Sequence, residues 1–194
     1  MPGANGVFVL APLGGAAGER IAEVQRQFDP KVAGESPPHV TLIGSSGVGP
    51  IDPGASPDAV RAALAPVVAA ARPLLLPFGR PERFPGTNVV ALPLAPHGPL
   101  RELHDRMAEA LARARIPTAR GRFTFTPHAT LSFYPTLAPA RLRELLALRF
   151  DEPAEVGHVE VTYTRSPQPG VVWWRGRLGE NSNGFLQDGQ DKGG

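Results

Sequence analysis

The sequence predicts an α+β fold made of two similar halves, and three observations support this prediction. The chain has 194 residues, enough for one domain or for two small lobes that share a core. Stretches with the period of an amphipathic helix alternate with short apolar stretches typical of strands. The pentad Pro-His-x-Thr-Leu occurs twice, at 38–42 and at 127–131, in equivalent places of the element order. A motif that repeats together with its neighbouring elements indicates a duplicated unit.

The first half begins with a strand and a helix. The apolar run at 6–13 predicts the strand. The stretch 14–28 predicts a helix, because Ile21, Val24 and Phe28 fall on one face of it.

A motif strand and a second helix follow. The motif strand covers 39–44 and ends at a Gly-Ser-Ser-Gly turn. The helix covers 56–72, with Ser56 as N-cap and Pro57 at its first position. Pro66 is expected to kink or divide this helix. Two more strands, at 73–79 and 88–94, flank a turn-rich segment and close the first half.

The second half repeats this order. The helix over 98–116 has the clearest apolar stripe, formed by Leu100, Leu103, Met107 and Leu111. The motif strand over 123–134 contains Pro127, so it is expected to start afresh at His128. A fourth helix is predicted over 138–150. Two strands, 158–165 and 170–179, are predicted to pair as a hairpin.

We therefore expect a bilobal unit over 1–179, with two mainly antiparallel sheets around a central cleft and helices outside. A pseudo-two-fold axis between the lobes would bring the two motifs face to face. The polar, Gly-rich stretch 180–194 is expected to form a flexible tail.

Composition excludes some kinds of site. The chain has no cysteine, so it has no disulfide, zinc–thiolate site or cysteine nucleophile. No run reaches the roughly 18 apolar residues that span a membrane, and no targeting segment is evident, so we expect a cytoplasmic protein. The formal net charge is +2, and nearly all of the positive charge is on arginine. Arginine suits contacts with phosphate, although a GC-rich genome also explains its abundance.

The repeated motif has a chemical meaning. Residues i and i+2 of a strand point the same way, so each motif sets an imidazole beside a hydroxyl, about 6–7 Å apart. A hydroxyl donates a hydrogen bond to an anionic oxygen, and an imidazole exchanges a proton near neutral pH. Two facing pairs suit a phosphodiester: His39 and His128 would transfer protons, and Thr41 and Thr130 would hold the nonbridging oxygens. A single such histidine is most often structural, but two copies at equivalent places favour the catalytic interpretation.

Two His-x-Thr motifs in a chain of this size resemble the two-histidine (2H) phosphoesterase superfamily, and within it the 2′-5′ RNA ligase or RNA 2′,3′-cyclic phosphodiesterase branch. The resemblance covers 7–178 in element order and is specific at the two motifs. It implies the bilobal 2H fold, catalysis by His39, Thr41, His128 and Thr130, no cofactor and no required metal. It also implies hydrolysis of RNA 2′,3′-cyclic phosphate ends to 2′-phosphates, with reversible 2′-5′ RNA ligation as a further activity. By the same resemblance, His128 activates water and His39 protonates O3′.

Further substrate contacts are predicted around the motifs. Members of the RNA ligase branch often carry a basic residue soon after the second threonine, where this chain has Leu-Ser-Phe-Tyr. Arg122, Arg165 or Arg175 would then supply the cation at the phosphate. Aromatic side chains that could stack on a base are Phe133, Tyr134 and Trp173. For the tryptophan pair at 173–174, one core-facing and one outward-facing side chain are expected, and a core residue in a surface hairpin explains them equally well.

The remaining histidines do not indicate a metal site. His97 precedes a helix and His104 lies within it, seven positions on, with no third ligand evident. His158 is expected at the surface. The segment 14–20 lacks the Gly-Lys-Ser/Thr ending of a P-loop and is interpreted as a turn and helix cap.

Three functions remain open on the sequence alone. The first is an RNA 2′,3′-cyclic phosphodiesterase with 2′-5′ RNA ligase activity. The second is a phosphodiesterase for a small nucleotide such as ADP-ribose cyclic phosphate. The third is an RNA-binding module without chemistry, which need not keep both histidines. The expected partner is RNA or a nucleotide with a 2′,3′-cyclic phosphate; we expect a monomer with no membrane association and no obligate protein partner.

Overall fold

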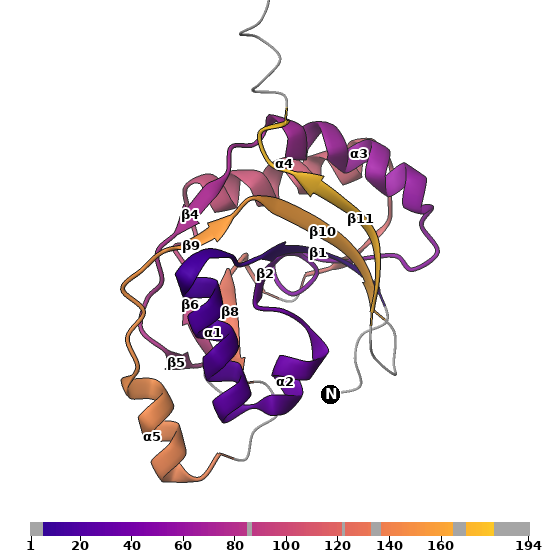
Figure 1. Ribbon diagram of the computed structural model, residues 1–194. Coiled ribbons are helices and arrows are strands. Elements are labelled where there is room, and N and C mark those ends of the chain that lie inside the picture. The colour runs from indigo at the N-terminus through magenta and orange to yellow at the C-terminus, as the bar shows by residue number, and fades with distance from the viewer. Residues whose placement is uncertain (1–5, 85–86, 122, 133–136, 165–169, 181–194) are drawn as a thin grey trace, which may run out of the picture.

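The computed structural model describes residues 6–84, 87–121, 123–132, 137–164 and 170–180 (Figure 1). Within these ranges the helices are α1 Gly15–Phe28, α2 Pro30–Glu35, α3 Pro57–Ala70, α4 Pro99–Arg113 and α5 Pro139–Ala147. The strands are β1 Gly6–Pro12, β2 His39–Ile43, β3 Val48–Ile51, β4 Leu74–Leu76, β5 Glu82–Arg83, β6 Val90–Pro93, β7 Thr118–Arg120, β8 His128–Ser132, β9 Ala154–Val156, β10 His158–Thr164 and β11 Val171–Arg177. No helix in the described ranges is long and apolar enough to cross a membrane. The predicted tail lies outside them, apart from the exposed Glu180.

The predicted helices and motif strands are present, and the apolar faces proposed for them are buried. In α1 the buried residues include Ile21, Val24 and Phe28. In α4 the whole predicted stripe is buried. The second motif strand starts at His128, as the proline before it indicated.

Helix α3 differs from its prediction, because Pro66 does not divide it. Ser56 caps the helix, its hydroxyl accepting a hydrogen bond from the backbone N–H of Ala59 at 3.4 Å. An internal proline costs a helix about 3 kcal/mol. Burial of one face, formed by Val60, Leu64, Val67 and Val68, offsets this cost.

The short elements α2, β3, β5, β7 and β9 were not predicted. Each spans only two to six residues, too few to show a helical or strand period. They are defined by their partners: β3 pairs with β1 and β7, and β9 pairs with β4. Such elements depend on tertiary contacts rather than on local sequence.

The strands form one large sheet in the order β11-β10-β1-β2-β8-β6-β5, with β3 and β7 beside β1, and a small β4-β9 sheet. Every described pairing is antiparallel. The mixed α+β class with antiparallel sheets is therefore confirmed. The two halves of the chain meet in this sheet at β2 and β8, where Val40 lies opposite Ala129.

Both halves build the surroundings of their motif in the same way. In the first half β1 flanks β2, with Pro12 opposite His39; in the second, β6 flanks β8, with Pro93 opposite His128. The residue after each of these prolines donates its N–H to the carbonyl of the proline that precedes the histidine, at 2.9 and 3.0 Å. This repeated geometry is the structural counterpart of the repeated pentad.

The halves are also tied together by α1, which lies beside β8 rather than beside its own motif strand (Figure 1). The Gln25 side chain donates from Nε2 to the carbonyl of Thr130 at 2.8 Å. The hydroxyl of Ser132, itself fully buried, donates to Asp29 at 3.2 Å. Asp29 also caps α2 by accepting from the N–H of Val32. Buried polar bonds of this kind fix the helix against the second motif strand.

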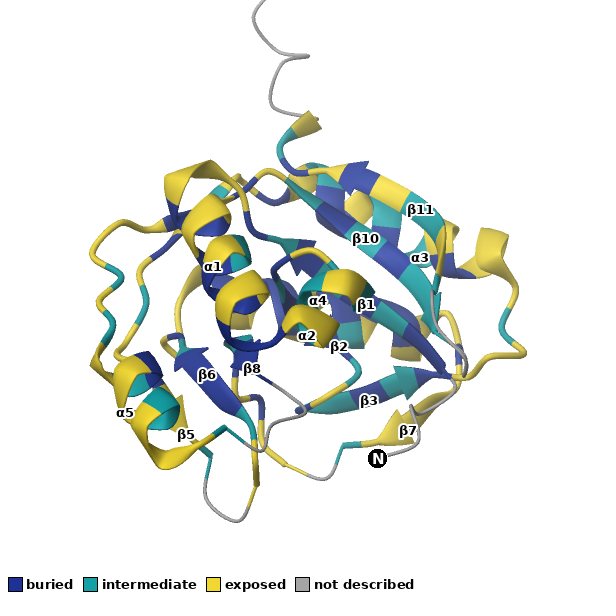
Figure 2. Ribbon diagram, turned by 60° about the horizontal axis from the view of Figure 1, so that its bottom comes forward, coloured by how far each residue is buried: buried dark blue, intermediate teal, exposed yellow. Residues whose placement is uncertain are grey.

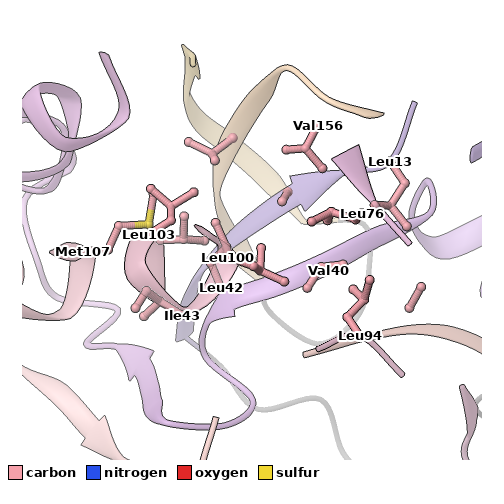
Figure 3. Close-up of a cluster of buried hydrophobic side chains, with 14 of the residues drawn as sticks. Leu13, Val40, Leu42, Ile43, Leu76, Leu94, Leu100, Leu103, Met107 and Val156 are labelled. Carbon is pink, nitrogen blue, oxygen red and sulfur yellow. The ribbon is translucent and has the colours of Figure 1, made fainter. Parts of the chain in front are cut away.

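The core lies on the face of the sheet opposite the motif side chains. Val40 and Leu42 of β2 are fully buried there, together with Ile43. Figure 3 shows these residues meeting the apolar stripe of α4 and Leu13, Leu76, Leu94 and Val156 from neighbouring segments. In Figure 2, β6 and β8 are buried along most of their length, while α1 is exposed on its outer side. Alternation along β2 therefore assigns one face to the core and leaves the other for chemistry.

Replacement of Leu42 by alanine should lower the free energy of unfolding by about 2–5 kcal/mol, because it removes a fully buried side chain from this cluster. Leu75→Ala is the matched control, since Leu75 is 67% exposed and its loss should change stability by less than about 0.5 kcal/mol. Urea denaturation followed by circular dichroism measures both. Equal effects of the two substitutions would show that Leu42 does not pack as described.

Candidate active site

The four motif side chains lie together on one face of the sheet. Because Val40 is opposite Ala129 in an antiparallel pair, the next residues outward also pair: His39 with Thr130, and Thr41 with His128. Val40 and Ala129 are buried, whereas the four motif residues are only partly buried, so these four share the opposite face. Directly opposed residues are about 5 Å apart, and the diagonal between the two histidines is about 7–8 Å. The structure thus brings all four predicted residues into one cluster.

Each imidazole is oriented by the same backbone contact. Nδ1 of His39 lies 2.8 Å from the carbonyl of Pro37, and Nδ1 of His128 lies 2.9 Å from the carbonyl of Thr126. A carbonyl only accepts, so Nδ1 must carry the hydrogen in both rings. In the neutral form Nε2 is then the basic nitrogen, and it is the atom available for proton exchange. Ser36 adds a hydroxyl 3.1 Å from Nδ1 of His39.

The surroundings lower the pKa of both histidines. Burial is the main cause for each, and the backbone carbonyl bonds oppose it. The pKa of His39 is lowered further by the nearby charge of His128 and raised by the carboxylate of Glu160. The electrostatic link between the two rings agrees with their placement on adjacent strands. A bound phosphate would raise both pKa values by favouring the imidazolium forms.

One residue of the site was missed by the sequence analysis. Phe84, beyond the end of β5, makes an edge-to-face contact with the ring of His128, with 4.8 Å between ring centroids and 74° between planes. This contact holds the imidazole from the side. Phe84 lies in a turn-rich segment, and its position beside β8 comes only from the pairing of β5 with β6 and of β6 with β8.

The tryptophan pair is not arranged as predicted. One side chain was expected to point out of the sheet, but both Trp173 and Trp174 pack against the core, and Trp173 lies 5.6 Å from Tyr163 between ring centroids. The reason is a register shift between Val161 and Thr162 of β10, which interrupts the alternation along β11. The contacts of Trp173 are therefore with the protein rather than with the motif face.

Arg175 does lie on the motif face. Its backbone is opposite Glu160, Glu160 is opposite Leu10, and Leu10 is opposite Thr41, so the four side chains form one row across the sheet. The guanidinium donates from Nε to the Glu160 carboxylate at 2.6 Å. The other predicted substrate contacts, Arg122, Phe133, Tyr134 and Arg165, lie outside the described residues.

The remaining histidines have other surroundings. His104 is buried, stacks on Phe125 at 4.0 Å and bonds the carbonyl of Leu42 at 2.6 Å, so it supports β2 from α4. His97 is exposed, and His158 lies 3.6 Å from Glu160. Within the described ranges, no group of three or more His, Cys, Asp or Glu side chains is arranged to hold a metal ion.

A family model described as the 2′-5′ RNA ligase superfamily matches residues 14–167. The chain belongs to this superfamily. Both motifs lie inside the matched range, and membership supports a general phosphoesterase activity of the 2H type. No curated protein sequence matches the chain significantly.

Solved structures of the superfamily share the fold of this chain. The protein TT0787 of Thermus thermophilus aligns with a TM-score of 0.63 at 14% identity, covering 89% of this chain and 97% of that one. E. coli LigT in its apo form aligns with a TM-score of 0.56 at 17% identity, covering 90% and 97%. E. coli LigT complexed with 3′-AMP aligns with a TM-score of 0.53 at 18% identity, covering 90% and 98%. This likeness over whole chains confirms the 2H phosphoesterase fold predicted from the motifs.

The two motif histidines should make the protein sensitive to mild acid. Their pKa values are lowered in the folded state, whereas an unfolded histidine titrates near about 6.5. Their contribution to stability is therefore complete above about pH 6.5 and is lost as the pH falls through the folded pKa values. Asparagine at both positions keeps a donor near Nδ1 and cannot take up a proton.

The double variant His39→Asn/His128→Asn should consequently lose less free energy of unfolding than the wild type between about pH 7.5 and pH 5. Denaturant titrations at several pH values measure the difference. Identical pH dependence in the two proteins would contradict the direction of these pKa shifts.

Proposed function

We propose that this phosphoesterase hydrolyses RNA 2′,3′-cyclic phosphate ends to 2′-phosphates without a metal ion. The observation that carries the proposal is the diagonal pair of His-x-Thr motifs across β2 and β8, each with its imidazole fixed by a backbone carbonyl. The two basic nitrogens then approach one phosphorus from different strands. An in-line displacement requires a proton acceptor on one side of the phosphorus and a proton donor on the other.

The proposed reaction is balanced as follows. One histidine removes a proton from water, and the resulting oxygen attacks the phosphorus. The bond from phosphorus to O3′ breaks, and the other histidine gives its proton to O3′. The product carries a 2′-phosphate and a 3′-hydroxyl. Thr41 and Thr130 donate hydrogen bonds to the nonbridging oxygens, whose negative charge is conserved through the step.

The same groups support 2′-5′ ligation. If the 5′-hydroxyl of a second RNA end replaces water, its oxygen attacks the cyclic phosphate, and O3′ leaves with the proton of the second histidine. The product is a 2′-5′ phosphodiester, and the reverse reaction splits it. The superfamily name and the structure of LigT with 3′-AMP are consistent with a nucleotide in this position.

Replacement of either motif histidine by alanine should lower turnover of a 2′,3′-cyclic nucleotide by roughly 10²–10⁴-fold, the usual contribution of one general acid or base. Thr41→Ala or Thr130→Ala should cost less, about 1–3 kcal/mol of transition-state stabilisation. Assays in EDTA with product analysis by chromatography measure these losses. His97→Ala, which removes an exposed histidine, is the control and should keep full activity. Full activity of either His39→Ala or His128→Ala would exclude the two-histidine mechanism.

The substrate class is tested by comparing a 2′,3′-cyclic mononucleotide with an oligonucleotide that ends in the same cyclic phosphate. If RNA is the substrate, the oligonucleotide should have the higher kcat/KM, because more of its backbone contacts the protein. Equal values for the two would favour the alternative substrate class, a small nucleotide such as ADP-ribose cyclic phosphate. Binding of the oligonucleotide with no turnover of either substrate would indicate an RNA-binding module.

A further inference from the structure

The two halves of the site are equivalent in their motifs and differ in the charged residue that faces each motif. On the first side, Thr41 is opposite Leu10, and Leu10 is opposite Glu160. On the second side, Thr130 is opposite Ala91, and Ala91 is opposite Glu82. Each half therefore carries a glutamate two strands away from its threonine, at a backbone distance of about 10 Å.

The two glutamates have different environments. The Glu160 side chain is only 16% exposed and accepts a hydrogen bond from Arg175 at 2.6 Å. Glu82 is exposed in the two-residue strand β5, where solvent screens its charge. Only the first half thus holds a carboxylate in a protected position on the motif face.

A protected carboxylate beside a site for an anionic phosphate is unfavourable unless it has a function there. Arg175 offsets part of its charge but is itself 65% exposed, so water screens it more than it screens the carboxylate. The groups around His39 are otherwise the His128 ring on β8, and His158 and Arg177 on the outer strands of the same face. Glu160 is the negatively charged group that acts on His39, and it favours the imidazolium form of that ring.

We propose that Glu160 is a positioning residue that stabilises the protonated form of His39, which makes His39 the proton donor to O3′ and leaves His128 as the base. This inference rests on the proposed function for its consequence in catalysis, but its electrostatic part concerns the free protein. Nothing equivalent acts on His128 among the described residues, where burial and the bond to Thr126 determine the pKa. The two histidines are therefore equivalent in geometry and unequal in charge.

The first test is an NMR titration of the imidazole resonances in the free protein, with His39 assigned from the spectrum of His39→Asn. Glu160→Gln should move the pKa of His39 downward, because the favourable negative charge is lost. Arg175→Gln should move it upward, because the carboxylate is then less compensated. Glu82→Gln, the substitution of the equivalent glutamate, should move neither motif histidine.

These variants separate the proposal from a merely structural ion pair. If Glu160 and Arg175 only stabilise the hairpin, their two substitutions lower stability alike and leave the pKa of His39 in place. That result would overturn the proposal even if the protein proved to be an active phosphodiesterase. Conversely, shifts in the expected directions in a protein without activity on cyclic phosphates would refute the proposed function and leave the electrostatic role of Glu160 intact.

The second test links the charge to the donor role. Above about pH 7, Glu160→Gln should turn over a 2′,3′-cyclic nucleotide more slowly than the wild type, because less His39 is protonated. On a nucleoside p-nitrophenyl phosphodiester, whose leaving group needs no proton, the variant should keep nearly the wild-type rate. An equal loss on both substrates would mean that Glu160 does not act through the proton donor.

Discussion

The pairing of β2 with β8 is the interaction on which the site depends. At this point the two halves of the chain share backbone hydrogen bonds, and the pair Val40–Ala129 sets the register. Because side chains alternate along a strand, a shift of one residue would turn one motif toward the core and the other away from it. The buried side chains on the far face of both strands make such a shift costly, since it would expose Val40 and Leu42 and bury two imidazoles.

The same packing that fixes the register also prepares the histidines for proton transfer. Recessed between strands, the rings are more easily neutral than in water, and a carbonyl two residues earlier in each motif holds Nδ1–H. That bond selects the tautomer whose free nitrogen can act as a base, and it stabilises the imidazolium once a proton arrives. The prolines before the histidines contribute here, because an extended Pro-His segment brings the carbonyl of residue i−2 back to the ring.

Duplication provides a symmetric frame, but catalysis of a single displacement needs an acid and a base. The structure resolves this with small local differences around equivalent motifs. Phe84 contacts the ring of His128, whereas Glu160 acts on His39. Helix α1 crosses from the first half to hold the backbone of Thr130 through Gln25. The two sides of the site are thus built from one pattern and distinguished by residues outside the pattern.

The sequence by itself determined the motifs, the long amphipathic elements and the family. His39, Thr41, His128 and Thr130 could be found because the side-chain alternation of a strand and the repetition of a pentad are both local properties. The burial of Leu100, Leu103, Met107 and Leu111 followed from helical periodicity for the same reason. Tertiary structure decided what local pattern cannot express: the register of β2 against β8, the bulge that turns both tryptophans toward the core, and the contacts of Phe84 and Glu160 with residues more than forty positions away. Those features arise from long-range pairing, in which each strand is placed by its neighbours rather than by its own sequence.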